Sequence, residues 1–81
     1  MDDVTARVRD VVANSFDVDP GELHDGTTAR DVEGWDSLAH ATLLLRLQRV
    51  FGIRLDAAEA NAAQDLGSLT ALVARAVGRH G

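Results

Sequence analysis

The sequence predicts an all-α fold, a small bundle of three main helices and one short helix. Apolar side chains recur at spacings of three and four along three segments, which is the periodicity of an amphipathic helix. No segment shows the sustained alternation that a half-buried strand would need. The chain has only 81 residues and one proline, so we expect a single domain over residues 1–81 with a modest core.

The first helix is expected from about Asp3 to Phe16. Asp2 and Asp3 suit its N-terminus, because acidic residues cap helices and favour the positive end of the dipole. The apolar residues of this segment share one face: Val4, Val8, Val11, Val12 and Phe16. The segment Asp17–Gly21 ends the helix, since the residue before a proline disfavours helical geometry.

A long loop follows, from about Asp17 to Asp36, with Leu23 and Val32 as its expected contacts with the core. The second main helix is expected from Ser37 to Phe51, where Leu43, Leu44, Leu47 and Phe51 form a core-facing stripe. Leu38, Ala41 and Leu45 repeat on an adjacent face, and Gly52 is a natural C-terminal stop. A helix apolar on both faces predicts an exposed apolar patch in so small a domain.

The C-terminal third predicts a short helix and a last main helix. Ile53 and Leu55 are expected to pack as the chain turns, and Asp56 to cap a short helix from about Ala57 to Gln64. Gly67 is expected to break that helix and Ser68 to cap the last one. The last helix carries its apolar residues at helical spacing: Leu69, Leu72, Val73, Ala76 and Val77.

Composition excludes several function classes. The formal net charge of −5 disfavours nucleic acid as a partner, because phosphate contacts need a basic surface, and it favours partners with basic patches. The chain has no cysteine, so any thiol chemistry must come from a prosthetic group. The acidic start Met1-Asp2-Asp3 predicts no signal peptide, and no apolar run is long enough to span a membrane. We therefore expect a soluble cytoplasmic protein, monomeric and without a metal ion.

The most informative motif is Gly34-Trp35-Asp36-Ser37-Leu38-Ala39-His40, which places a serine where a loop becomes an apolar helix. Backbone N–H groups at a helix N-terminus favour negative charge, so the Ser37 hydroxyl lies in a good place for a phosphate. By itself the Asp36-Ser37 pair has an ordinary explanation as a helix cap.

The ensemble of motifs resembles the acyl carrier proteins over nearly the whole chain. The resemblance rests on Asn14-Ser15-Phe16, the loop ending at Asp36-Ser37-Leu38, the Leu43/Leu47/Phe51 pattern and the final Ser68-Leu69 helix. It implies that Ser37 carries a 4′-phosphopantetheine arm, added by a phosphopantetheinyl transferase from coenzyme A, with Asp36 helping in transferase recognition. The arm would hold acyl cargo as a thioester and present it to partner enzymes, so the protein itself would not be an enzyme.

Partner contacts are expected around the serine and along the helix that follows it. The partners implied are the transferase, an acyl-loading enzyme, and polyketide-type synthase or tailoring enzymes. Trp35 could equally pack the loop against the bundle. The candidate contact residues are Trp35, Leu38, His40, Ala41, Leu45, Arg46 and Arg49.

The segment between Leu38 and Phe51 contains arginines and no Asp or Glu. In this it differs from the acidic helix that follows the serine in many fatty-acid carriers. The serine motif looks more like discrete carriers of specialised-metabolite pathways. An aminoacyl (peptidyl) carrier and an unmodified helical interaction module remain alternatives. A hydrolase built on Ser37, Asp36 and His40 is disfavoured, since a Ser–His pair also needs an orienting group, an oxyanion hole and a pocket. His24 and His80 have no companions at metal-ligand spacing and are read as solvated.

Overall fold

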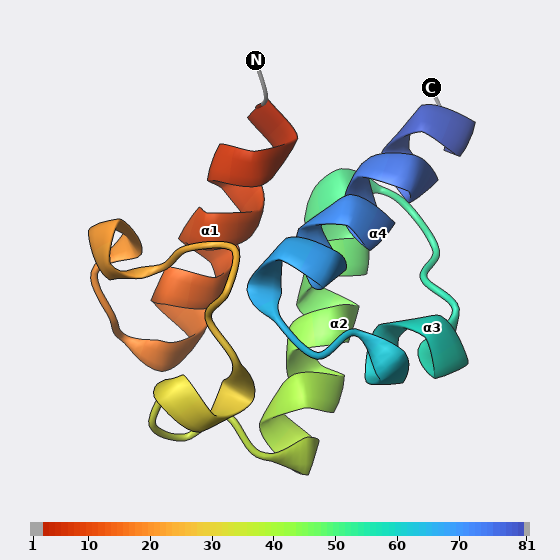
Figure 1. Ribbon diagram of the computed structural model, residues 1–81. Helices are drawn as coiled ribbons and strands as arrows, with labels where there is room; N and C mark the ends of the chain where they lie inside the picture. The colour runs from red at the N-terminus through yellow and green to blue at the C-terminus, as the bar shows by residue number, and fades with distance from the viewer. Residues whose placement is uncertain (1–2, 81) are drawn as a thin grey trace.

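The computed structural model describes residues 3–80, which contain helices, turns and loops and no strand. Three helices of fourteen or fifteen residues and one of six form the bundle, which confirms the predicted all-α architecture. Two 3₁₀ turns, η1 and η2, lie in the long loop (Figure 1). In chain order the elements are α1 (Asp3–Phe16), η1 (Pro20–Glu22), η2 (Ala29–Asp31), α2 (Ser37–Phe51), α3 (Ala57–Ala62) and α4 (Leu66–His80).

The helix α1 runs opposite to α2 and α4, and the short α3 lies at the side of the bundle, below α4 in the view of Figure 1. Arg7 ties the beginning of α1 to the end of α2. Its guanidinium donates to the Val50 carbonyl oxygen at 3.3 Å and lies 4.6 Å from the centre of the Phe51 ring. The beginning of α1, the end of α2 and the end of α4 thus lie at one end of the molecule, and α2 begins at the other end (Figure 1).

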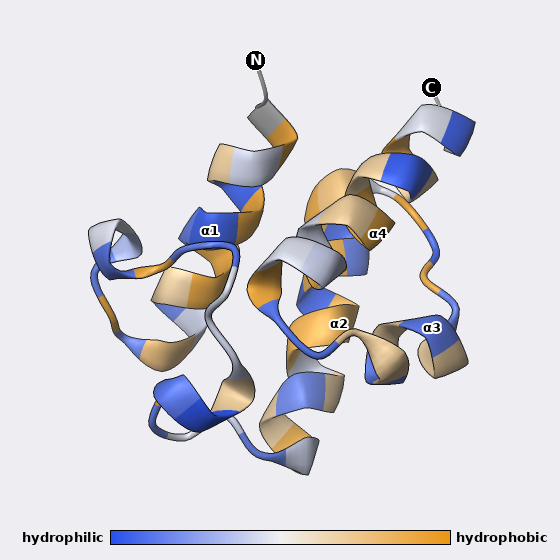
Figure 2. Ribbon diagram, viewed as in Figure 1, coloured by the Kyte–Doolittle hydropathy of each residue, from blue (hydrophilic) through white to orange (hydrophobic). Residues whose placement is uncertain are grey.

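The core lies between α1, α2 and α4, whose inward faces carry the apolar residues (Figure 2). Burying each such aliphatic side chain contributes about 1.5–3 kcal/mol, which is offset largely by chain entropy. Leu23 and Val32 are buried and hold the long loop to this core, as the sequence predicts. The largest fully buried side chains are Val8, Val12, Leu43, Leu47, Leu66, Leu69 and Val73.

The first two helices end on the same backbone motif. Asp17 and Gly52 adopt left-handed conformations with φ of 57° and 65°. The following N–H donates back to the carbonyl five residues earlier, Val18 to Ala13 and Ile53 to Gln48, both at 3.0 Å. Glycine is favoured in this conformation, and aspartate is one of the few other residues that tolerate it. The predicted end of α1 and the Gly52 stop are both confirmed.

The predicted start of the last helix was wrong. The helix α4 begins at Leu66, so Gly67 and Ser68 lie in its first turn. The cap is Asp65, whose Oδ1 accepts a hydrogen bond from the Ser68 N–H at 2.8 Å. Hydrogen bonds from Ser68 hold the pKa of the Asp65 carboxyl below its ordinary value. Sequence analysis named Ser68 as the cap and did not consider Asp65, which belongs to a residue type that caps helices equally well.

The short helix was also predicted two residues too long, since α3 ends at Ala62 rather than Gln64. Ala63 is extended, and its N–H donates to the Glu59 and Ala60 carbonyl oxygens, which closes the last turn of the helix. Asp56 caps α3 as predicted, accepting from the N–H groups of Ala58 and Glu59. The predicted capping role of Asp2 lies outside the described residues.

Candidate functional site

Ser37 is the first residue of α2 and is exposed. Asp36 is the N-cap, and its Oδ1 accepts from the Ala39 N–H at 2.8 Å. That bond satisfies one of the first N–H groups of the helix and leaves those of Ser37 and Leu38 without an intrahelical acceptor. The hydroxyl therefore stands in water beside free donors at the positive end of the helix dipole.

An aromatic stack positions the loop that presents Ser37. The Trp35 ring stacks on Phe16 of α1, with 5.0 Å between ring centroids and an angle of 19° between planes. The His40 ring of α2 lies nearly parallel to the Trp35 ring, with 6.1 Å between ring centroids and an angle of 24° between planes. Trp35 is half-buried, so packing of the loop against the bundle is one role that the structure gives it.

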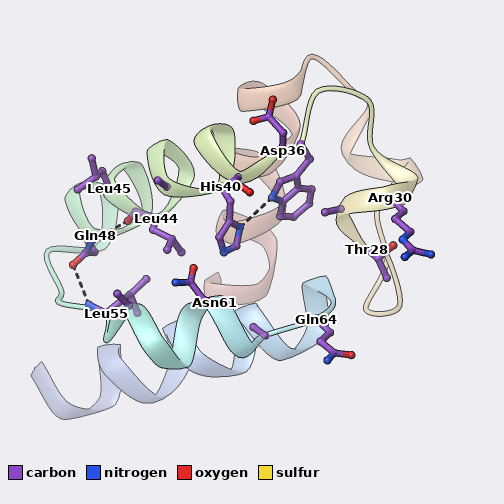
Figure 3. Close-up of a pocket in the computed structure, with 16 residues that line it drawn as sticks. Thr28, Arg30, Asp36, His40, Leu44, Leu45, Gln48, Leu55, Asn61 and Gln64 are labelled. Atoms are coloured by element: carbon purple, nitrogen blue, oxygen red, sulfur yellow. Dashed lines mark hydrogen bonds between the residues drawn. The ribbon is translucent and has the colours of Figure 1, made fainter.

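His40 connects this stack to α3. The Trp35 indole Nε1 donates to His40 Nδ1 at 3.1 Å (Figure 3). His40 Nε2 lies 3.3 Å from the Ala60 carbonyl oxygen. An indole nitrogen can only donate, so Nδ1 accepts and the neutral ring carries its proton on Nε2, which donates to Ala60. The sequence analysis missed this internal role, because nothing in the sequence shows that Ala60 lies beside α2.

The same hydrogen bonds argue against a hydrolytic pair. A general base for Ser37 would need a ring nitrogen free to accept the hydroxyl proton. Both nitrogens of His40 are engaged elsewhere, one by Trp35 and the other by Ala60. Ser37 and His40 share a groove without forming the nucleophile–base arrangement that covalent catalysis requires.

An open groove of about 1270 Å³ lies beside Ser37, between α2 and α3 (Figure 3). Its wall from α2 carries both apolar and polar side chains, and the opposite wall adds the Asn61 amide and the Leu55 side chain. The α2 residues that line the groove are Ser37, His40, Ala41, Leu44, Leu45 and Gln48. Asn61 was missed from the sequence, where it stands in an alanine-rich segment with no signal of its own.

Gln48 holds the segment that leads from α2 to α3. Its Nε2 donates to the Leu44 carbonyl at 3.2 Å, and its Oε1 accepts from the Leu55 N–H at 3.0 Å (Figure 3). Together with His40, Gln48 anchors the far wall of the groove to α2. The sequence does contain a sign of this role, because Gln48 is a polar residue at the edge of the core-facing stripe of α2. The sequence analysis did not use it.

The face of α2 that points away from the core carries the predicted apolar patch. Leu38 is 78% exposed and Leu45 is 66% exposed. Ala41, Arg46 and Arg49 are exposed as well. The structure thus brings these five candidate residues onto the outer surface of one helix, whereas Trp35 and His40 are half-buried against the bundle.

The loop before α2 is acidic. Asp31, Glu33 and Asp36 are exposed on it. Asp31 Oδ2 accepts from the Thr28 N–H at 2.9 Å and from its hydroxyl at 3.2 Å. These hydrogen bonds hold the pKa of Asp31 below its ordinary value, so its carboxylate stays charged at neutral pH. Negative charge therefore gathers at the end of α2 that holds Ser37.

Comparison with known proteins identifies the class. A family model described as "Phosphopantetheine attachment site" matches residues 6–73, which include Ser37, all of α2 and the groove. The chain belongs to this family of non-catalytic carrier domains, whose prosthetic group is 4′-phosphopantetheine.

A solved structure places the chain more closely. It is similar to the holo acyl carrier protein of Geobacter metallireducens, determined in solution by NMR, with a TM-score of 0.85 and 27% sequence identity. The match covers 95% of this chain and 88% of that one. The fold and the prosthetic group are therefore those of an acyl carrier protein.

Within residues 3–80, none of the helices has the length and apolar character needed to cross a bilayer. Within the same range, no three His, Asp or Glu side chains gather closely enough to hold a metal ion.

Proposed function

We propose that Ser37 is the residue that carries 4′-phosphopantetheine. The observation that carries this assignment is an exposed hydroxyl at the N-terminus of α2, beside free N–H donors. A phosphodiester on Oγ would be stabilised there by the helix dipole. Nothing in the described part of the chain covers the hydroxyl, and the matched family region spans it.

The residues around Ser37 fit the prosthetic group. When bound, the group supplies a thiol that holds acyl cargo as a thioester. Ser37 anchors the group, and the adjoining groove offers apolar and amide contacts along α2 and Asn61. Asp36 holds the helix start in place through Ala39, and its exposed carboxylate is the proposed point of transferase recognition.

The proposed partners are enzymes that approach the outer face of α2. They are a phosphopantetheinyl transferase with coenzyme A, an acyl-loading enzyme, and synthase or tailoring enzymes of a polyketide-type, specialised-metabolite pathway in the cytoplasm. The lack of acidic residues between Leu38 and Phe51 supports this assignment over general fatty-acid synthesis. We propose that residues 1–81 act as a single monomeric carrier domain, with Trp35, Leu38, His40, Ala41, Leu45, Arg46 and Arg49 as contact residues.

The test is the mass of the intact protein after incubation with a phosphopantetheinyl transferase and coenzyme A. We expect the wild-type chain to gain one phosphopantetheine unit and Ser37→Ala to gain none. Asp36→Asn keeps a good N-cap while removing a charge, so we expect slower modification with unchanged helix content by circular dichroism. Modification of Ser37→Ala, or an adduct mapped to another residue, would contradict the assignment.

An aminoacyl carrier would be modified in the same way and differs only in its cargo. Mass spectrometry of the protein from its native host, with the thioester intact, separates acyl from aminoacyl cargo. An unmodified interaction module would keep its original mass under conditions that convert a known carrier fully.

A further inference from the structure

We infer that His40 is a positioning residue for the modification of Ser37, and that it acts through the indole of Trp35. The hydrogen bond between these two side chains sets the direction in which the loop enters α2, and with it the place of the Ser37 hydroxyl. The inference rests on the proposed function, since it concerns how Ser37 is presented to a transferase.

Packing does not hold the start of α2 in place. Asp36, Ser37 and Leu38 are all exposed, and the exposed fraction of Leu38 is 78%. The hydrogen bond from the Ala39 N–H to Asp36 ties the cap to the first turn of the helix. It does not fix the loop that precedes the cap, so the direction of that loop depends on contacts made by neighbouring side chains.

Trp35 and His40 occupy the two positions that determine how a chain enters a helix. Trp35 immediately precedes the N-cap, and His40 is the fourth residue of α2. A contact between side chains at these two positions sets the entry angle of the chain, and apolar pairs commonly provide it. Here a hydrogen bond provides it, because Trp35 Nε1 donates to His40 Nδ1 at 3.1 Å (Figure 3).

Trp35 is held from the side of α1 as well. Its ring is half-buried and stacks on Phe16, with 5.0 Å between ring centroids. The preceding Gly34 has a φ of 90°, so the loop reaches Trp35 through a turn that glycine permits. Ser37 therefore lies two residues beyond a side chain that is fixed both to α1 and to the first turns of α2.

The second ring nitrogen of His40 has a different role. Nε2 lies 3.3 Å from the Ala60 carbonyl oxygen, and Ala60 is completely buried in α3. This bond holds the far wall of the groove and does not involve the loop before Ser37. Because one nitrogen accepts and the other donates, the two roles can be tested separately.

Two amide substitutions separate these roles. Asparagine places its amide oxygen near the position of Nδ1, so His40→Asn keeps an acceptor for the Trp35 indole and loses the bond to Ala60. Glutamine places its amide nitrogen near the position of Nε2, so His40→Gln keeps a donor for Ala60 and loses the acceptor for the indole. Trp35→Phe removes the indole donor and keeps an aromatic ring beside Phe16.

The first experiment measures kcat and KM for modification of Ser37 by a phosphopantetheinyl transferase with coenzyme A. We expect His40→Gln and Trp35→Phe each to lower kcat about tenfold with little change in KM, because a misplacement on the order of 1 Å impairs an oriented reaction more than binding. His40→Asn should stay within about twofold of the wild type, since it restores the acceptor. The double variant Trp35→Phe, His40→Gln should lose no more than either single variant, since both remove the same bond.

The second experiment uses the unmodified protein and no transferase. Hydrogen exchange followed by NMR reports the indole N–H of Trp35, the one tryptophan of the chain. We expect this N–H to exchange faster in His40→Gln than in His40→Asn. The backbone N–H of Ala63, which closes the last turn of α3, should show the reverse order.

The matched control for reduced stability is Val73→Ala. Val73 is completely buried in α4, so its truncation leaves a small cavity in the core and destabilises the domain without removing either bond of His40. We expect Val73→Ala to keep the kcat of the wild type. A loss of kcat as large as that of His40→Gln would assign the effect to reduced stability and overturn the positioning role.

The remaining outcomes separate this inference from the proposed function. A wild-type chain that is never modified at Ser37 overturns both. If the wild-type chain is modified, equal kcat values for His40→Gln and His40→Asn overturn only the positioning role. Losses of Trp35→Phe and His40→Gln that add in the double variant would show that each side chain acts by itself, and would also overturn it.

Discussion

At the scale of single residues, His40 does more for the site than its position in the motif suggests. Its two ring nitrogens join the loop before Ser37 to α3, through the Trp35 indole and the Ala60 carbonyl. The motif placed both Trp35 and His40 near the serine. The hydrogen bonds between them and α3 could not be predicted, because they depend on how residues twenty positions apart meet in space.

His40→Leu tests this connection, since it keeps side-chain volume while removing both hydrogen bonds. We expect the free energy of unfolding to fall by about 1–3 kcal/mol, the usual cost of leaving partly buried polar groups unpaired. Hydrogen exchange should accelerate most at the amides of residue 60 in α3 and of residue 63, which follows the end of α3. His24→Leu serves as the control, because His24 is exposed. Equal α3 exchange in the two variants would contradict the connection.

At the scale of elements, the beginning of α4 shows how contacts decide a boundary. The Leu66 N–H donates to the Thr27 carbonyl at 2.7 Å, and the Gly67 N–H donates to the Asp25 carbonyl at 2.8 Å. These bonds fix the first turn against the long loop. A Cβ on Gly67 would lie 2.9 Å from the Asp25 Cβ and 3.1 Å from its carbonyl oxygen, so glycine permits close approach here and does not end a helix.

Two glycine substitutions in α4 should therefore act in opposite directions. Gly67→Ala forces the loop away from the helix, and we expect a loss of about 1–3 kcal/mol, as in overpacked cores. Gly78→Ala meets no atom within 4 Å, and we expect a gain of about 0.5–1 kcal/mol from better helix propensity. Urea unfolding of both variants measures the difference. Equal effects would show that Gly67 is not held closely to Asp25.

The sequence predicted elements best where periodicity and capping agree. The bounds of α1 and α2 follow from apolar spacing, from Asp36 as cap and from Gly52 as stop, and the structure has the same bounds. Prediction failed at α4, where Asp65 and Ser68 are both good capping residues. The complete burial of Leu66 decides between them, and burial is a property of the assembled bundle rather than of the local sequence.

At the scale of the whole molecule, stability depends on carboxylates that act as local hydrogen-bond acceptors. The pKa values of Asp31 and Asp65 are both lowered, by hydrogen bonds from Thr28 and Ser68 respectively. A lowered pKa in the folded state means that the stabilisation is fully present above the unfolded value of about 3.9. It is lost as the pH falls through the folded value.

We expect the free energy of unfolding to decline below about pH 4 as these carboxylates are protonated. Asp65→Asn retains a capping oxygen that does not titrate, so its decline should be shallower than that of the wild type. Urea midpoints measured from pH 6 to pH 3 provide the comparison, with Asp10→Asn as a control on the exposed side of α1. An identical decline for Asp65→Asn and wild type would contradict the role of this cap.

The beginning of α1 and the end of α4 lie at the same end of the molecule, and α2 begins at the opposite end (Figure 1). A tag, a fluorophore or a surface linker attached at the beginning of α1 or the end of α4 therefore lies at the opposite end of the molecule from the serine. Immobilised protein would still offer its hydroxyl to enzymes in free solution, which allows binding kinetics to be recorded on a sensor chip without obstructing the reactive end.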